Sequence, residues 1–483
     1  MTSHQKESNT NIAYKKLGIN ISLFAISAFG SKILQFLLVP LYTNCLSTAE
    51  YGTVDLLSTV VQLLVPVFTL DIADAVLRFS LDDFENKSSV FAIALQIIMY
   101  GAAVLLAILV GVKLFFGIKY PVSYYYFIFF NFLFSAIYSS ISYYLRGLEK
   151  VKAVVVAGVM STLVNVIFNI LFLLILGWGM NGYLSANIIG IIVPTIYLMI
   201  VAYHEKCVVL FNNKNEQVIK IQMLKYSLPL IVNGISWWIN NSLDRFVVTA
   251  FLGVESNGLL AVAYKIPSIL AMFTTIFSQA WTMSAVQEFD SEDKNHFLSR
   301  TYSLYNCGMT IVCSCILLLN IPFAYILYAK DFFVAWQYTG FLIVAYLFGA
   351  LVTCVSGIFS AVKDSKTIAI STMIGACTNF LLNITLIGYI GIQGATFATL
   401  ISNIIVWIYR MYKVRTYVKL RIRIKRDIAS YVIVLVQCVI GLQANHCYFG
   451  QMLCLAIIIL LYKNDIITVI NVLKNKSSIL RRK

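Results

Sequence analysis

Long apolar runs, separated by short polar segments, follow one another along almost the whole chain. A helix that crosses a bilayer needs about 20 mainly apolar residues. On that rule the pattern predicts fourteen spans, at 17–42, 53–72, 89–112, 121–144, 153–176, 182–203, 226–252, 257–280, 303–328, 334–360, 368–390, 392–409, 428–444 and 448–462. The pattern therefore predicts an all-α polytopic membrane protein.

Two segments far apart in the chain resemble each other. LYTNCLSTAEYGTV (41–54) aligns with VVTAFLGVESNGLL (247–260) at an offset of 206, and Thr43 then matches Thr249. Later in the chain the offset is 214, and it pairs Asn165 with Asn379, Asn169 with Asn383, Lys152 with Lys366, and Gly177 with Gly391. The alignment indicates an internal repeat.

The repeat divides the chain into three predicted parts. They are a six-helix bundle at 1–210, a second six-helix bundle at 211–420, and two additional helices with a basic tail at 421–483. Because six is even, both bundles begin on the same side of the membrane, so the repeat is parallel. Transporters with parallel repeats bind substrate between the two halves, and we expect the same here.

The composition agrees with a membrane protein. Hydrophobic residues make up 60% of the chain and charged residues 12%, whereas a soluble domain has about 25% charged residues. The polar N-terminal stretch leads into an apolar run too long for a signal peptide, and we expect that helix to be retained. The ten cysteines are scattered without the spacing of a metal or redox site.

The basic residues are distributed unevenly between the two sides of the predicted membrane. With the N-terminus placed in the cytoplasm, 30 of the 36 Lys and Arg fall in cytoplasmic segments and three in outer segments. This split follows the positive-inside rule and predicts that both termini are cytoplasmic. The net charge of +15 therefore reports topology and attraction to anionic lipid headgroups, and we expect no nucleic-acid partner.

The motifs of common enzymes are missing from the sequence. GWGMNG (177–182) matches a dinucleotide fingerprint by letters, but it joins two predicted spans and lacks the required strand and helix. The sequence contains no phosphate-binding loop of the G-x-x-x-x-G-K-[ST] type, and its four His lie outside the spans. We expect a protein that is not an enzyme and uses neither a cofactor nor a metal centre.

Four charged residues fall inside predicted spans. Asp244 and Lys265 each lie eight residues from the turn at 253–256, which places them and Arg245 ~12 Å below the outer surface. Lys32 lies deeper, ~21 Å from its helix end. Charged residues in spans are costly and usually face a water-filled cavity. An ion pair between Asp244 and Lys265 that staples two helices is the alternative interpretation.

A polar stripe accompanies these charges. Asn233, Trp237, Asn240 and Asp244 follow one another at i, i+4, i+7 and i+11, so they share one face of a helix. Pro267, two residues after Lys265, is expected to kink the next span and loosen its backbone. The pattern predicts a wet, net cationic cavity lined by the stripe, Lys32, Arg245 and Lys265, with Asp244 as a possible ion-coupling residue.

The region KYSLPLIVNGISWWINNSLDRFVVTAFLGVESNGLLAVAYKI (225–266), followed by FSQAWTMSAVQEF (277–289), resembles the Wzx-type polysaccharide flippases. These belong to the multidrug/oligosaccharidyl-lipid/polysaccharide exporter superfamily, abbreviated MOP. The resemblance implies a V-shaped pair of bundles that work by alternating access. Lys32 and Arg245 most resemble the membrane-embedded basic residues of the related lipid II flippase, although that relative has Arg where this chain has Lys32.

The resemblance also implies a function. It is the translocation of undecaprenyl-pyrophosphate-linked oligosaccharides for O-antigen, capsule or exopolysaccharide synthesis, from the inner to the outer leaflet of a bacterial cytoplasmic membrane. A polysaccharide polymerase and a chain-length regulator are the implied protein partners. The alternative is an ion-coupled multidrug or cation exporter of the same fold, which a net-negative cavity would favour. A purely structural membrane scaffold would not need buried charge.

The predicted topology can be tested by labelling. Single cysteines placed at 415–426 of a variant without native cysteines should resist a membrane-impermeant thiol reagent in intact cells, because this basic segment is predicted to be cytoplasmic. They should react once the cells are permeabilised. Labelling of intact cells at these positions would contradict the predicted orientation.

Overall fold

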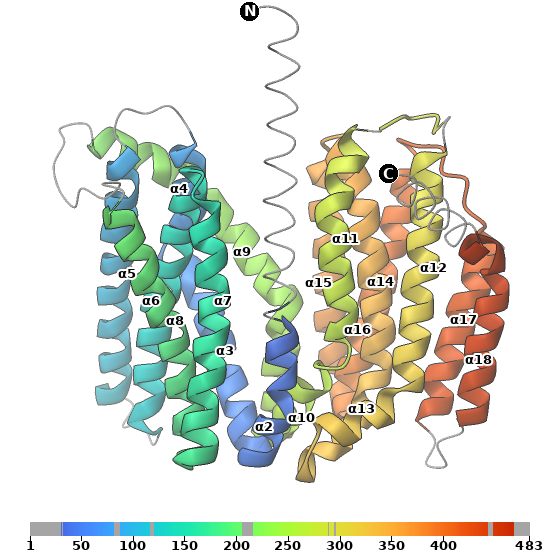
Figure 1. Ribbon diagram of the computed structural model, residues 1–483, viewed down its shortest axis with the longest axis horizontal. Coiled ribbons are helices and arrows are strands. Elements are labelled where there is room, and N and C mark those ends of the chain that lie inside the picture. The colour runs from blue at the N-terminus through green and yellow to red at the C-terminus, as the bar shows by residue number, and fades with distance from the viewer. Residues whose placement is uncertain are drawn as a thin grey trace, which may run out of the picture. The chain divides into compact units, whose positions relative to one another are not determined.

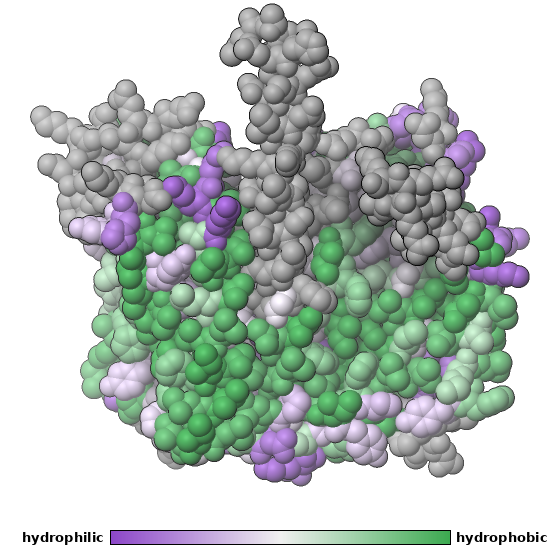
Figure 2. All heavy atoms as spheres, in the orientation of Figure 1, coloured by the Kyte–Doolittle hydropathy of each residue, from purple (hydrophilic) through white to green (hydrophobic). Residues whose placement is uncertain are grey.

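The computed structural model describes residues 30, 32–81, 87–115, 120–204, 216–287, 289–293, 296–442 and 448–467. These residues form helices joined by short turns and contain no strand, which confirms the predicted all-α membrane fold. Nine of the described helices are long and apolar enough to cross a membrane, and a bent pair provides a tenth candidate. Hydrophobic residues cover the sides of the helices, and hydrophilic residues gather toward their ends (Figure 2).

The chain folds into two compact units, Met1–Ser242 and Leu243–Lys483. In each unit the long helices run roughly side by side (Figure 1). Unit 1 contains α2 (Val39–Cys45), α3 (Thr48–Phe68), α4 (Ile72–Ser80), α5 (Lys87–Phe115), α6 (Val122–Gly147), α7 (Val151–Asn169), the π-helix η1 (Ile170–Ile175) and α8 (Gly179–His204). The next helix, α9 (Glu216–Leu252), contains the boundary between the units.

Unit 2 holds the remaining helices. They are α10 (Val254–Ala263), α11 (Ser268–Gln287), α12 (Phe297–Leu318), α13 (Asn320–Leu327), the 3-10 helix η2 (Lys330–Ala335), α14 (Trp336–Ala361), α15 (Ser365–Ile390), α16 (Ile392–Val414), α17 (Ile424–Gly441) and α18 (Tyr448–Leu461). The predicted spans from 53–72 onward each coincide with one or two of these helices. The first predicted span, 17–42, lies mostly outside the described residues. The domain limits predicted at 210 and 420 stay a prediction.

Helix bounds in the two units repeat at the offset seen in the sequence. Both ends of α6 recur in α14 after 214 residues, and the first residue of α7 recurs as the first residue of α15. The turns repeat as well, because Glu149 and Lys363 both have a φ of 60°, in the left-handed region. Residues with a side chain rarely adopt that region. The internal repeat is therefore a repeat of structure.

The matched asparagines make the same contacts in both units. Asn169 Nδ2 donates to the backbone oxygen and to Oδ1 of Asn165, at 2.7 and 3.0 Å. Asn383 Nδ2 donates to the same two atoms of Asn379, at 2.9 and 2.8 Å. The first asparagine of each pair also reaches the next helix: Asn165 Nδ2 donates to Asn187 Oδ1 of α8 at 3.1 Å, and Asn379 Nδ2 donates to Thr399 Oγ1 of α16 at 3.3 Å. Hydrogen bonds between spans hold helices together where lipid supplies no partner, so each asparagine pair forms a polar clamp on the next helix.

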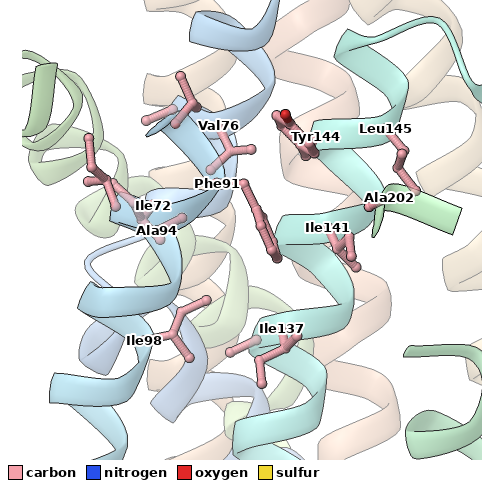
Figure 3. Close-up of a cluster of buried hydrophobic side chains, with 14 of the residues drawn as sticks. Ile72, Val76, Phe91, Ala94, Ile98, Ile137, Ile141, Tyr144, Leu145 and Ala202 are labelled. Atoms are coloured by element: carbon pink, nitrogen blue, oxygen red, sulfur yellow. The ribbon is translucent and has the colours of Figure 1, made fainter. Parts of the chain in front are cut away.

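The core of unit 1 is apolar and lies between α4, α5 and α6. Phe91 and Tyr144 stack with ring centroids 5.5 Å apart and an interplanar angle of 27°, and both are almost completely buried. In the close-up, Phe91 reaches from α5 toward α6, and Ile72 and Ile141 lie on either side of it (Figure 3). In a membrane such close packing, and not exclusion from water, drives helices together.

Close packing makes two glycines of α5 a matched test. A Cβ at Gly101 would lie 2.0 Å from the backbone oxygen of Phe68, whereas a Cβ at Gly111 would meet nothing within 4 Å. We expect Gly101→Ala to lower the stability of the purified protein by about 1–3 kcal/mol, as overpacking does. Gly111→Ala should leave stability unchanged or raise it by up to about 1 kcal/mol. Thermal unfolding in detergent measures both, and equal melting temperatures would contradict the close approach of α3 and α5.

Candidate functional site

Three of the four intramembrane charges gather around the start of unit 2. Asp244 and Arg245 lie on α9, and Lys265 lies in the break between α10 and α11. The axis bends by 51° at this break, which confirms the kink expected from Pro267. Proline lacks the N–H that would continue the helix. Interrupted helices at membrane depth are tolerated where the freed backbone lines a cavity or is covered by protein.

Asp244 is held by a tyrosine. Asp244 is 5% exposed. Its carboxylate accepts a hydrogen bond from the Tyr264 hydroxyl and, at 2.9 Å, one from the backbone N–H of Arg245. Burying a carboxylate without donors would cost several kcal/mol, and hydrogen bonds to an ionised acceptor are among the strongest in proteins. Tyr264 therefore compensates much of the cost of keeping this acid inside the protein.

The Arg245 guanidinium lies beside the same tyrosine. Its central carbon is 5.8 Å from the centroid of the Tyr264 ring, and the ring of Tyr346 is 6.4 Å from that of Tyr264. Cations within about 6 Å of an aromatic face are attracted by the ring. One tyrosine thus contacts both members of the acid–base pair: its hydroxyl contacts Asp244 and its ring contacts Arg245.

Lys265 takes no part in an ion pair with the residues that the structure describes. The backbone N–H of this half-buried residue donates to Val262 O at 2.9 Å, and its carbonyl accepts from Ser268 Oγ at 2.6 Å. The staple between Asp244 and Lys265, the alternative interpretation of the sequence, is not formed, because Tyr264 occupies the place beside Asp244.

Further polar residues of unit 2 lie near this cluster. Thr399 lies close to the Tyr264 hydroxyl, and its Oγ1 accepts from Asn379 Nδ2 at 3.3 Å. Asn379 in turn is joined to the fully buried Asn383. The sequence had singled out both asparagines through the repeat, whereas Tyr264 and Thr399 were missed. Nothing in their sequence context distinguishes them from other polar residues in spans.

The remaining candidates fall elsewhere. Lys32 is half-buried and belongs to unit 1, so a single site shared by Lys32 and Arg245 stays a prediction. The side chains of Asn233, Trp237 and Asn240 lie outside the described residues, and the polar stripe stays a prediction too. In the described parts of the chain, no group of three or more His, Cys, Asp or Glu is arranged to hold a metal ion.

A buried arginine in unit 2 was not expected. Arg410 follows the predicted span 392–409, but α16 continues to Val414, and Arg410 is only 4% exposed. Its guanidinium donates to the Ser371 and Thr372 hydroxyls at 2.8 and 3.1 Å and also to the Ser356 hydroxyl. Within the described residues it has no acidic partner. Because these hydroxyls belong to α14 and α15, Arg410 ties three helices together.

A second unexpected network joins the last two helices to the rest of unit 2. Asp427 Oδ1 accepts from Arg426 at 2.9 Å and from the Tyr462 hydroxyl at 3.2 Å. Asn306 Nδ2 donates to Tyr462 at 3.1 Å, and the Tyr431 hydroxyl donates to Asn306 Oδ1 at 3.0 Å. These residues lie on α12, on α17 and directly after α18, which the sequence alone did not bring together. Buried polar groups without such partners would be costly.

The fold and the charged cluster define a class of protein. Two units with one internal architecture, spans that are interrupted, and charges at span depth are features of membrane transporters. The family model of polysaccharide biosynthesis proteins matches residues 17–282. The chain belongs to this family, and the predicted family resemblance is confirmed.

Solved structures support the fold. The lipid II flippase MurJ in an inward closed conformation is 18% identical, with a TM-score of 0.67, over 92% of this chain and 99% of that one. An inward-facing multidrug resistance MATE family transporter of the MOP superfamily is 13% identical, with a TM-score of 0.59, over 80% and 95% of the two chains. The chain therefore has the fold of MOP superfamily transporters.

Archaeal proteins are also similar to the chain. An uncharacterised membrane protein of Methanocaldococcus jannaschii is 22% identical over 301 residues, which cover 59% of this chain and 68% of that protein. A MOP superfamily transporter from Pyrococcus furiosus is 13% identical, with a TM-score of 0.55, over 82% of this chain and 96% of that one. The fold thus also occurs in an archaeal transporter.

The geometry predicts which residues act together. In double-mutant cycles for thermal stability, Asp244→Asn and Lys265→Gln should be additive within about 0.5 kcal/mol, because the two side chains do not pair. Asp244→Asn and Tyr264→Phe should instead show a coupling of about 0.5–3 kcal/mol, as hydrogen-bonded neighbours do. If the coupling of Asp244 to Lys265 were as large as its coupling to Tyr264, the ion pair between Asp244 and Lys265 would be the correct interpretation.

Proposed function

We propose that this protein is a flippase for undecaprenyl-pyrophosphate-linked oligosaccharide repeat units. It moves them from the inner to the outer leaflet of a bacterial cytoplasmic membrane, for the synthesis of O-antigen, capsule or exopolysaccharide. Membership of the polysaccharide biosynthesis family and the MOP transporter fold support the proposal. The observation that carries it is the pair of cations in unit 2, Arg245 and Lys265, beside an interrupted span.

The chemistry of the substrate explains why cations are needed. A pyrophosphate in hydrocarbon loses its water of hydration and gains nothing in exchange. A guanidinium offers two parallel N–H donors to phosphate oxygens, and an ammonium offers a point charge. Arg245 therefore binds one phosphate in a fork, and Lys265 neutralises the second charge. The polyprenyl tail stays in the bilayer throughout.

The other polar groups of the site have matching roles. Hydroxyl and amide groups such as those of Tyr264, Asn233 and Asn240 suit sugar hydroxyls, and an aromatic ring such as that of Trp237 suits the apolar face of a sugar. Lys32 of unit 1 is the proposed third cation. Alternation between conformations open to the two leaflets then carries the headgroup across. Both termini are proposed to face the cytoplasm. A polysaccharide polymerase and a chain-length regulator are the proposed protein partners.

A second function has one observation in its favour. Asp244 is a buried acid on α9, hydrogen-bonded to Tyr264 at the break between α10 and α11, and the solved structures of similar fold include multidrug MATE transporters. An ion-coupled multidrug or cation exporter would use Asp244 as its proton or ion site. Such an exporter would accumulate a fluorescent lipophilic cation inside inverted vesicles, and loss of that transport in Asp244→Asn would favour it over the flippase.

Substitutions of Arg245 test the flippase. We expect Arg245→Ala to reduce translocation of a fluorescent undecaprenyl-pyrophosphate glycan in proteoliposomes by at least about tenfold, because a charge-assisted phosphate contact is lost. Arg245→Lys should retain part of the activity, since it keeps the charge but loses the fork. Arg300→Ala, at an exposed arginine outside the cluster, is the matched control and should leave the rate unchanged.

Two outcomes would contradict the flippase. Normal translocation by Arg245→Ala, at normal protein abundance, would remove Arg245 from the phosphate site. Normal surface polymer in a strain that lacks the gene would remove the proposed cargo altogether.

A further inference from the structure

The connection between α16 and α17 carries exposed cations that the transport site does not use. Arg415, Arg421, Arg423 and Lys425 are all exposed to solvent. None of the four has an acidic partner among the residues that the structure describes, and Arg421 Nη1 lies 3.4 Å from His296 Nε2. Two neighbouring cations are already neutralised, because Lys419 pairs with Glu292 at 3.0 Å and Arg426 pairs with Asp427 and Asp465.

Main-chain hydrogen bonds hold this segment in place. The Lys419 N–H donates to Ser291 O at 3.1 Å, and the Arg421 N–H donates to Ser299 Oγ at 2.8 Å. Val418 between them is buried. The exposed cations therefore lie on a backbone that is fixed by hydrogen bonds to Ser291 and to Ser299 in the first turn of α12.

The spacing of the cations shows what kind of ligand fits. Arg421 and Arg423 lie in the connection, and Lys425 lies in the first turn of α17. Three separate cations distributed in a row along the chain in this way match several negative charges spread over a surface.

The position of the row indicates which surface that is. The segment joins the end of one span, at Val414, to the beginning of the next helix, at Ile424, so it lies at the level where spans leave the hydrocarbon. Ile424 and Ile428 beside it are 45% and 50% exposed. Exposed apolar side chains next to cations are typical of protein surfaces that rest on lipid headgroups.

We propose that Arg421, Arg423 and Lys425 bind the anionic phospholipid headgroups of the leaflet at this end of unit 2, which the charge distribution predicts to be cytoplasmic. The contact anchors the ends of α16 and α17 to the membrane surface. It does not depend on which cargo the protein carries, so it goes beyond the proposed function. It gives the protein a requirement for acidic lipid.

Retention of lipid by the purified full-length protein tests this proposal. The protein is equilibrated in detergent with phosphatidylglycerol or phosphatidylcholine, and bound lipid is measured by native mass spectrometry. Cations near a charged membrane surface contribute about fivefold each to binding. We therefore expect the triple variant Arg421→Gln/Arg423→Gln/Lys425→Gln to bind phosphatidylglycerol at least about tenfold more weakly, with phosphatidylcholine unaffected.

A control with the same loss of charge separates the row from net charge. Lys152→Gln/Lys225→Gln/Lys463→Gln removes three exposed cations that lie on three different helices or helix ends, and its affinity for phosphatidylglycerol should stay within about threefold of the original. High salt should weaken binding to the original protein and to the control alike, because the contact is electrostatic. Both variants should keep the melting temperature of the original protein.

Two results would overturn the proposal. The first is unchanged phosphatidylglycerol binding by the triple variant. The second is a loss of binding to inorganic pyrophosphate or undecaprenyl pyrophosphate with phosphatidylglycerol binding intact, which would assign the row to a substrate headgroup. The assay contains no glycan and measures no translocation, so failure of the proposed flippase activity would leave its outcome unchanged.

Discussion

Hydrocarbon offers no hydrogen-bond partner, so every buried polar group in a membrane protein must find one inside the protein. In the described helices many buried polar side chains meet this constraint by hydrogen-bonding to one another. Asn165 and Asn169 in unit 1, and Asn379 and Asn383 in unit 2, form the same clamp. Arg410 meets hydroxyls of two neighbouring helices. The polar residues of the spans thus determine which helices pack together.

The same constraint separates structural charges from those free to bind. The Arg410 guanidinium is surrounded by hydroxyl and backbone oxygens, and it donates its hydrogen bonds to them. Arg410 is therefore a structural residue. Arg426 is likewise neutralised by two acids. Lys265 remains half-buried and makes no ion pair among the described residues. A charge that the protein does not neutralise, at membrane depth, is the kind that a charged substrate can neutralise.

Much of the fold could be predicted because a bilayer imposes a length on every span. The apolar runs therefore predicted the positions of the helices, and the repeat predicted which helices correspond. The kink at Pro267 followed from the missing N–H. The contacts of Asp244 could not be predicted, since Lys265 and Tyr264 are adjacent in the chain, and only the path of the broken helix decides which of them reaches the acid.

The sequence by itself determined the all-α membrane fold, the repeat, the family and the candidate cations, because these depend on hydrophobicity and residue type along one dimension. The tertiary structure decided that Tyr264 binds Asp244, that Arg410 lies buried, and that a network around Asp427 fastens the last two helices. Those contacts join residues from different helices. Their formation depends on how neighbouring helices rotate and pack, which local sequence does not specify.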